Sequence, residues 1–235
     1  MNYEDLLEMV KNRRSFRRFK RDAIPEGSVE KIIEVARYSP SAGNSQPWEF
    51  IVVEDDKVKR SITKNIALKF GDAEKIDPDL YTGCAVQPHM YTAPVLIVVC
   101  GDPRLEQTYP KFLDRGILLH QSLAICIYSM ELAAASLGLV TAWATIQGGP
   151  PEEEVKKLLD IPNVLTVDHI IPLGYPDEEG ERKNERMRPV RERARQRRSF
   201  NELVHYSKYD RSRLRSDKEI ADFIWSKSVT RITRS

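Results

Sequence analysis

Two short segments near the start of the chain stand out, RRSFRRF at residues 13–19 and SPSAGNSQPW at residues 39–48. In an extended backbone successive side chains point to opposite sides, so Arg13, Ser15 and Arg17 share one side. Two guanidinium groups and a hydroxyl placed together can bind a phosphate and the polar edge of a ring. The second segment is rich in turn-forming residues and hydrogen-bond donors. Together the two segments predict a site for an anionic ligand.

Plainer interpretations of these residues also exist. An Arg-rich run after a helix is often an ordinary solvated face, and we favour this interpretation for Arg18. Pro47 fixes the entry to a following strand, and Trp48 suits a structural role there. The sequence contains no evident Ser/His/Asp or Cys/His constellation. A lone histidine on an apolar helix, such as His120, is more often a core residue than a ligand.

The composition narrows the class of protein. With 235 residues the chain can bury a sizeable core. Lys and Arg number 37 against 35 Asp and Glu, and this formal net charge of +2 excludes a strongly basic protein that coats a polymer. Nine Arg or Lys and only three Glu lie within residues 181–198. This stretch leaves open a nucleic-acid or anionic-surface binder, although it lacks interleaved aromatic residues that stack on bases.

The cysteines and the N-terminus indicate a soluble protein of the reducing cytoplasm. Cys84, Cys100 and Cys126 are widely spaced and form no CxxC pair, which argues against a disulfide framework or a zinc site. The first residues carry acidic side chains and no apolar core of signal-peptide length. The longest uncharged apolar stretch, residues 116–130, is too short to span a bilayer. We therefore expect neither a metal nor a membrane partner.

Short-range patterns predict a mixture of helices and strands. Apolar spacing and helix-start residues predict helices from Asn2 to near Asn12, around residues 29–36, over 114–137 and from Pro150. Apolar, β-branched runs predict strands over residues 49–53, 95–100, 140–144 and 166–173. The pattern over 114–137 is the longest helical one and is apolar almost all round. Such a helix belongs in the middle of a core or at a large subunit interface.

The chain is predicted to form one domain over residues 1–206, followed by a C-terminal extension over 207–235. Within the domain, residues about 66–92 lack a clear period, which predicts a long irregular excursion. This excursion is either a lid over a site or a mere surface loop. Residues about 177–198 are polar and charged, and they predict a basic arm.

The order of several segments resembles the nitroreductase family of FMN-dependent oxidoreductases. The match begins with residues 13–19 and 39–53 and continues with TIQGG and DHIIPLGYP, at residues 145–149 and 168–176, after the long helical pattern. Several ordered matches are more specific than any one of them. The resemblance covers roughly residues 3–205. It implies an α+β nitroreductase-like fold with a central, mostly antiparallel sheet flanked by helices, in an intertwined homodimer with FMN at the subunit interface.

The resemblance also implies roles for particular residues. Arg13 and Ser15 would hold the FMN phosphate and ribityl chain, supported by Arg14, and Arg17 would reach the pyrimidine edge of the ring. A second subunit would line the ring and ribityl chain with Pro40, Ser41, Ala42 and Asn44. Backbone amides at Thr145, Ile146, Gln147 and Gly148 would face the flavin N5 and O4 atoms. Arg195 and Arg197 fit the basic pair that closes the phosphate site, although Arg186 and Arg188 offer the same spacing.

The implied reaction is hydride transfer from NADH or NADPH through flavin N5 to an electron-poor acceptor such as a nitroaromatic, a quinone or an activated alkene. No catalytic side chain is expected, since the flavin supplies the reactive atom. Candidate substrate contacts are Tyr81, His89, Tyr91 and Phe112. Alternatives within the same fold are reductive dehalogenation and flavin fragmentation. The flavin-fragmentation branch usually departs from the SPSxxNSQPW pattern, which is intact here, so fragmentation ranks well below a reductase.

Overall fold

A computed structural model describes residues 2–76, 90–108, 116–146, 148–182, 191, 197–220 and 222. The chain divides into two compact units, residues 1–180 and 181–235, which are described separately. The predicted boundary at 206/207 stays a prediction.

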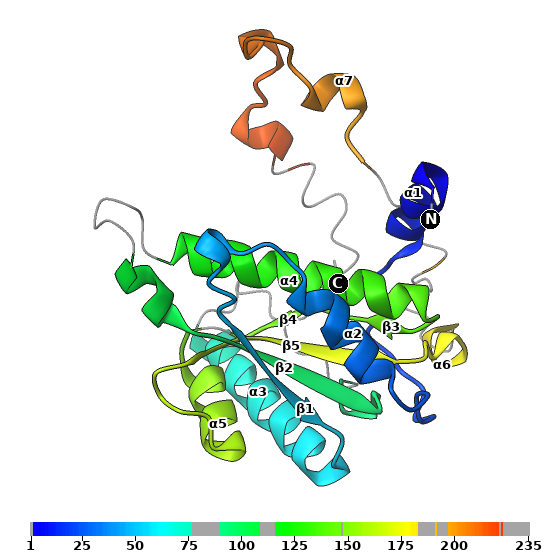
Figure 1. Ribbon diagram of the computed structural model, residues 1–235, viewed down its shortest axis with the longest axis vertical. Coiled ribbons are helices and arrows are strands. Elements are labelled where there is room, and N and C mark those ends of the chain that lie inside the picture. Colours follow the sequence, from blue (N-terminus) through cyan, green and yellow to red (C-terminus); the bar gives the residue numbers. More distant parts are fainter. Residues whose placement is uncertain are drawn as a thin grey trace. The chain divides into compact units, whose positions relative to one another are not determined.

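The first unit is built around a five-stranded sheet (Figure 1). Its order is β1 (Trp48–Val53), β2 (Val95–Gly101), β5 (Thr166–Gly174) and β3 (Val140–Thr141), and β4 (Ala144–Thr145) also pairs with β5. Every strand pair is antiparallel, as predicted. A register shift interrupts the β2–β5 pairing between Val99 and Cys100.

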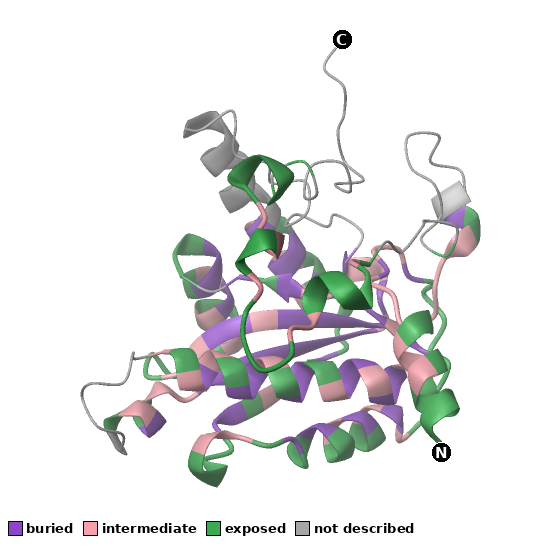
Figure 2. Ribbon diagram, turned by 90° about the horizontal axis from the view of Figure 1, so that it is seen from above, coloured by how far each residue is buried: buried purple, intermediate pink, exposed green. Residues whose placement is uncertain are grey.

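Helices cover both faces of this sheet. In Figure 1, α2 (Ser28–Arg37) and α4 (Ile117–Ser136) lie on one face, and α3 (Asp56–Ile76) and α5 (Pro150–Leu159) lie on the other. All seven residues of β2 are therefore buried, because their side chains enter a core on either side. The strands are mostly buried, whereas the flanking helices alternate between buried and exposed residues (Figure 2).

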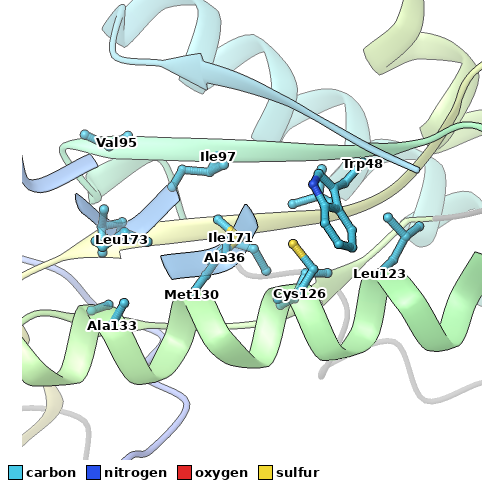
Figure 3. Close-up of a cluster of buried hydrophobic side chains, with 14 of the residues drawn as sticks. Ala36, Trp48, Val95, Ile97, Leu123, Cys126, Met130, Ala133, Ile171 and Leu173 are labelled. Carbon is cyan, nitrogen blue, oxygen red and sulfur yellow. The ribbon is translucent and has the colours of Figure 1, made fainter. Parts of the chain in front are cut away.

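One core fills the space between the sheet and the α2–α4 layer. Figure 3 shows Trp48, Val95, Ile97 and Ile171 directed from the strands toward Cys126, Met130 and Ala133 of α4. Burial of these apolar side chains is the main favourable contribution to folding of this layer. Cys100 and Cys126 are free thiols, and burial raises the pKa of each to about 12.

The helix α4 is apolar on nearly every side, yet only part of its surface faces the core. Ile125 and Tyr128 are 43% and 38% exposed. Of the described helices, α4 alone has the length and hydropathy that a membrane crossing requires, and half of its most apolar window is buried in the protein. Its packing against the sheet is that of a core helix.

The helix α1 (Tyr3–Asn12) begins and ends where the sequence indicates. Asn2 caps it, since its side chain accepts a hydrogen bond from the backbone of Asp5 while the Asp5 side chain accepts one from Asn2. This reciprocal arrangement satisfies two backbone donors at the helix start.

Two sequence-based expectations need correction. No helix was predicted after β1, but α3 runs from Asp56 to Ile76, with Val58, Ile62 and Ile66 forming an apolar stripe in its first half. The expected irregular excursion over 66–92 therefore starts with a helix, and α3 is also longer than α4. Residues 77–89 lie outside the described part. The single strand expected over 140–144 is two short strands, β3 and β4, with Trp143 between them bonded to His169. The basic arm begins with a short helix, α6 (Glu178–Arg182).

The second unit contains α7 (Phe200–Leu203), which Ser199 and Glu202 cap reciprocally. Arg213 links its segments, with its guanidinium bonded to the carbonyl of Val204 at 3.1 Å and to Asp210 at 2.9 Å. Most of the described residues of this unit are exposed.

Candidate functional site

The Arg-rich segment lies along one edge of the sheet. Ser15 forms a parallel bridge with Thr141 of β3, and the backbone nitrogen of Phe16 donates to the Thr141 carbonyl at 2.9 Å. Phe16 and Phe19 are 2% and 3% exposed. These two buried rings anchor the segment. The half-buried side chains between and before them are Arg13, Arg14, Ser15, Arg17 and Arg18.

A buried carboxylate lies next to the first of these arginines. Oε1 of Glu131, on α4, is 3.5 Å from Nη1 of Arg13 and accepts a hydrogen bond from the Thr141 hydroxyl at 3.1 Å. Burial raises the pKa of Glu131, although Arg13 and Thr141 oppose this rise. The three side chains thus join α4, β3 and the start of the Arg-rich segment.

The turn after β4 presents glycine backbone to open space. Gly148 and Gly149 have φ angles of +78° and +107°, and no atom lies within 4 Å of where a Cβ would stand on either residue. Such angles favour glycine. Ile146, two residues before Gly148, is buried and donates its backbone N–H to the Asp168 carbonyl at 3.1 Å. A planar ligand could therefore approach this backbone closely.

Glu152 holds this turn against the sheet. One carboxylate oxygen accepts from the backbone nitrogen of Gly148 at 2.8 Å and the other from that of Val167 at 2.9 Å. Lys156 lies 2.9 Å from the same side chain. Burial alone would raise the pKa of Glu152, but the two N–H donors and Lys156 outweigh it and lower the pKa. The N–H of Gly148 is therefore already bonded to protein.

The Arg-rich segment and the glycine turn lie beside the same pair of strands. Ser15 is level with Thr141, and the turn begins after Thr145. Four residues of extended chain span about 13 Å. This separation suits an elongated ligand with an anionic end and a planar end.

Residues 40–44 rest on α4. The backbone nitrogen of Ala42 donates to the Ser122 hydroxyl at 3.2 Å, and the Ser39 hydroxyl contacts that of Ser129 at 2.8 Å. Asn44 adopts a left-handed conformation with φ of 55°. Pro40 and Asn44 are exposed, whereas Ser41 and Ala42 are half-buried.

Comparison with known proteins identifies the family. The model of the nitroreductase family matches residues 10–175. The chain belongs to the nitroreductase family. An Archaeoglobus fulgidus protein named NADH dehydrogenase/NAD(P)H nitroreductase is 34% identical over 179 residues, which are 75% of this chain and 88% of that protein. The predicted class of enzyme, an oxidoreductase, is thereby confirmed.

Solved structures share the fold. A nitroreductase family protein from Clostridium novyi NT has a TM-score of 0.60 at 27% identity, covering 77% of this chain and 88% of that one. An oxidised iodotyrosine deiodinase, bound to FMN and 3-iodo-L-tyrosine, has a TM-score of 0.60 at 25% identity, covering 87% and 100%. The nitroreductase-like α+β fold predicted from the sequence is confirmed.

Several predicted site residues of this nitroreductase family member cannot be placed at the site. Tyr81, His89, Phe112, Gln147 and Arg195 lie outside the described residues. Arg197 belongs to the second unit. Tyr91 is described, and its ring lies 5.5 Å from the guanidinium carbon of Arg21 and 4.7 Å from that of Arg60. These cation–π contacts anchor Tyr91 to its neighbours.

A second titratable cluster joins the start of α4 to β5 and was missed by sequence reasoning. Nδ1 of His120 is 3.2 Å from Oδ1 of the fully buried Asp168. Burial raises the pKa of Asp168, although Thr166 and His120 oppose this rise. Contrary to the expected core position, the His120 side chain is 43% exposed. The available signal was an aspartate within a mostly apolar strand, TVDHIIPLG.

Nearby, Trp143 donates its indole N–H to Nδ1 of His169 at 2.7 Å. Burial, with a smaller electrostatic contribution from His120, lowers the pKa of His169 to about 4. His169 is therefore neutral at physiological pH, with its proton on the other nitrogen. Among the described residues, no group of three His, Cys, Asp or Glu side chains could hold a metal ion.

Proposed function

We propose that this chain is an FMN-dependent oxidoreductase that transfers hydride from NADH or NADPH to an electron-poor acceptor. The observation that supports it best is the placement of the Arg-rich segment and the glycine turn beside the same two strands, β3 and β4. Membership of the nitroreductase family and the FMN held by the similar deiodinase structure agree with this proposal.

The residues present fit the chemistry of FMN. Its phosphate requires cations and hydroxyl donors, which Arg13, Arg14 and Ser15 supply from one segment. Its planar ring requires a surface without side chains, which Gly148 and Gly149 leave open. In this assignment the phosphate lies at the Arg-rich end and the ring lies toward the turn.

When bound, FMN supplies an N5 atom that accepts hydride and passes it on. The protein contributes positioning and charge. Arg17, two residues beyond Ser15 on the same segment, would lie at the pyrimidine edge, where its charge would stabilise the reduced ring. The backbone of Thr145, Ile146 and Gly148 would lie close to the ring, and Gln147, outside the described residues, is proposed to join them. Since the N–H of Gly148 binds Glu152, its role toward the ring is to allow close approach rather than to donate.

A homodimer completes this site. Hydrogen bonds to α4 hold the segment that contains Pro40, Ser41, Ala42 and Asn44. In the proposed dimer this segment would contact the flavin of the partner subunit. Partial exposure of Ile125 and Tyr128 on α4 supports the same arrangement, because a subunit contact would remove these apolar side chains from water.

Two classes of electron acceptor suit the proposed enzyme. A nitroaromatic acceptor agrees with the name of the similar nitroreductase, and quinones and activated alkenes are further electron-poor acceptors of the proposed reaction. Reductive dehalogenation is a second candidate, favoured by the deiodinase structure that covers 87% of this chain.

The visible spectrum of the purified protein tests the proposal. A yellow protein with flavin absorbance, bleached under anaerobic conditions by NADH or NADPH, is expected. Adding a nitroaromatic, a quinone or 3-iodotyrosine to the reduced protein then shows which acceptor restores the colour. A colourless protein that does not retain added FMN would overturn the proposal.

A further inference from the structure

Glu131 is an unusual residue for its position. It is the only Asp, Glu, Lys or Arg among the 20 residues of α4, and its side chain is 4% exposed. Taking a carboxylate out of water is unfavourable, and a buried ion pair is often no more stabilising than well-packed apolar residues. Stability therefore does not explain a charge at this position.

We propose that Glu131 is a positioning residue, which holds the Arg13 guanidinium in the orientation that binds the phosphate of the flavin nucleotide. The inference rests on the proposed function, since it presumes that the flavin phosphate binds at Arg13. A guanidinium has five N–H donors in a planar fork, so it can bind a carboxylate and a phosphate together.

The backbone and the side chain of Arg13 are both restrained. Its backbone nitrogen donates to the Met9 carbonyl at 2.9 Å at the end of α1, and its side chain is only 16% exposed. Glu131 adds the contact at Nη1. A long, flexible arginine side chain loses considerable rotamer freedom when it binds a ligand, and a restraint in place beforehand reduces that loss.

Thr141 extends this restraint to the rest of the segment. Its hydroxyl donates to Glu131, its carbonyl accepts from Phe16, and its neighbour across the bridge is Ser15. Glu131 thus sets the position of Arg13 relative to Ser15, the two residues assigned to the phosphate end. The glycine turn is held by a different carboxylate, that of Glu152.

Glu131 acts at the phosphate end of the site and Glu152 at the glycine turn, so flavins with and without a phosphate can test the inference. FMN carries the phosphate, whereas riboflavin has the same ring and ribityl chain without it. Glu131→Gln keeps the shape of the side chain and an oxygen for the Thr141 hydroxyl but removes the charge facing Arg13. Dissociation constants for both flavins are measured on flavin-free protein by quenching of flavin fluorescence.

We expect Glu131→Gln to weaken FMN binding about tenfold, the effect of losing one charge-assisted contact, and to change riboflavin binding by less than about twofold. In an Arg13→Ala background the same substitution has no further effect on FMN, because Glu131 acts through Arg13. The matched control is Glu152→Gln, a second buried carboxylate, which weakens both flavins by the same factor.

Several results would overturn the inference. Equal weakening of FMN and riboflavin by Glu131→Gln would indicate a merely structural role. Unchanged or tighter FMN binding would show that Glu131 only neutralises Arg13. A wild-type protein that binds FMN no better than riboflavin would refute this inference alone. A wild-type protein that binds neither flavin would refute the proposed function, and this inference with it.

Discussion

The two carboxylate oxygens of Glu152 accept hydrogen bonds from the backbone of Gly148 and of Val167, at 2.8 and 2.9 Å. One side chain thereby ties the glycine turn to β5. Each oxygen accepts one hydrogen bond, so both are needed for the two contacts. The carboxylate thereby fixes the distance between the N–H of the turn and the N–H of the strand.

Glu152→Gln is expected to destabilise the protein by about 2 kcal/mol at pH 7, because the amide has one acceptor oxygen and places its NH2 group against a backbone N–H. Urea denaturation measures this change. Glu153→Gln, at the exposed neighbouring position, serves as the control and should change stability by less than about 0.5 kcal/mol. Equal effects of the two substitutions would contradict the role of the bidentate contact.

The buried imidazole of His169 makes stability depend on pH. Its pKa is lowered from 6.5 to about 4 in the folded protein. Between these values the unfolded chain binds the additional proton, so the stabilisation is complete above about pH 6.5 and is lost as pH falls through this window. The expected loss by pH 4 is about 3 kcal/mol.

His169→Asn tests this assignment, since the Asn side-chain oxygen can replace Nδ1 as acceptor for Trp143 but does not titrate in this range. Denaturation curves collected from pH 7.5 to pH 4.5 should show a shallower decline for the variant. Parallel declines in the two proteins would exclude His169 as the titrating group.

Lys59 is 3% exposed, and its ammonium group donates to the carbonyls of Ala93 and Pro94 at 2.9 and 2.8 Å. Lys59→Met should destabilise the protein by about 2–4 kcal/mol, because two buried carbonyls lose their donor. Thermal unfolding measures the loss, and Lys64→Met, on the exposed side of α3, is the control. A melting temperature for Lys59→Met as high as that of the control would refute this anchoring role.

Gly101 lies where strand β2 ends against α4 and β5. A Cβ at this position would stand 2.8 Å from both Leu123 Cδ1 and Thr166 Oγ1. Gly101→Ala is therefore expected to destabilise the protein by about 1–3 kcal/mol through overpacking. Gly138→Ala provides a contrast, because its surroundings are open and only its φ of +72° opposes a side chain, at about 1 kcal/mol. Chemical denaturation of both variants would reveal whether crowding at Gly101 has the larger effect.

Local patterns predicted much of this fold correctly. The cap at Asn2 marks the start of α1, apolar runs mark β1, β2 and β5, and Pro150 marks the start of α5. These features depend on neighbours in the chain, so a short window of sequence contains the relevant interactions. The same approach missed the whole of α3, because polar residues and Gly71 interrupt its apolar pattern.

The sequence by itself determined the family, the main strands, several helices, and the presence of arginines, glycines and turn residues suited to a flavin nucleotide. Only the tertiary structure decided which groups meet. Arg13 and Glu131 are 118 residues apart, and His120 meets Asp168 across α4 and β5. No periodicity encodes such contacts, because they arise when the sheet and helices bury their apolar faces against one another. The same packing holds Glu131 and Asp168 in surroundings that raise their pKa values.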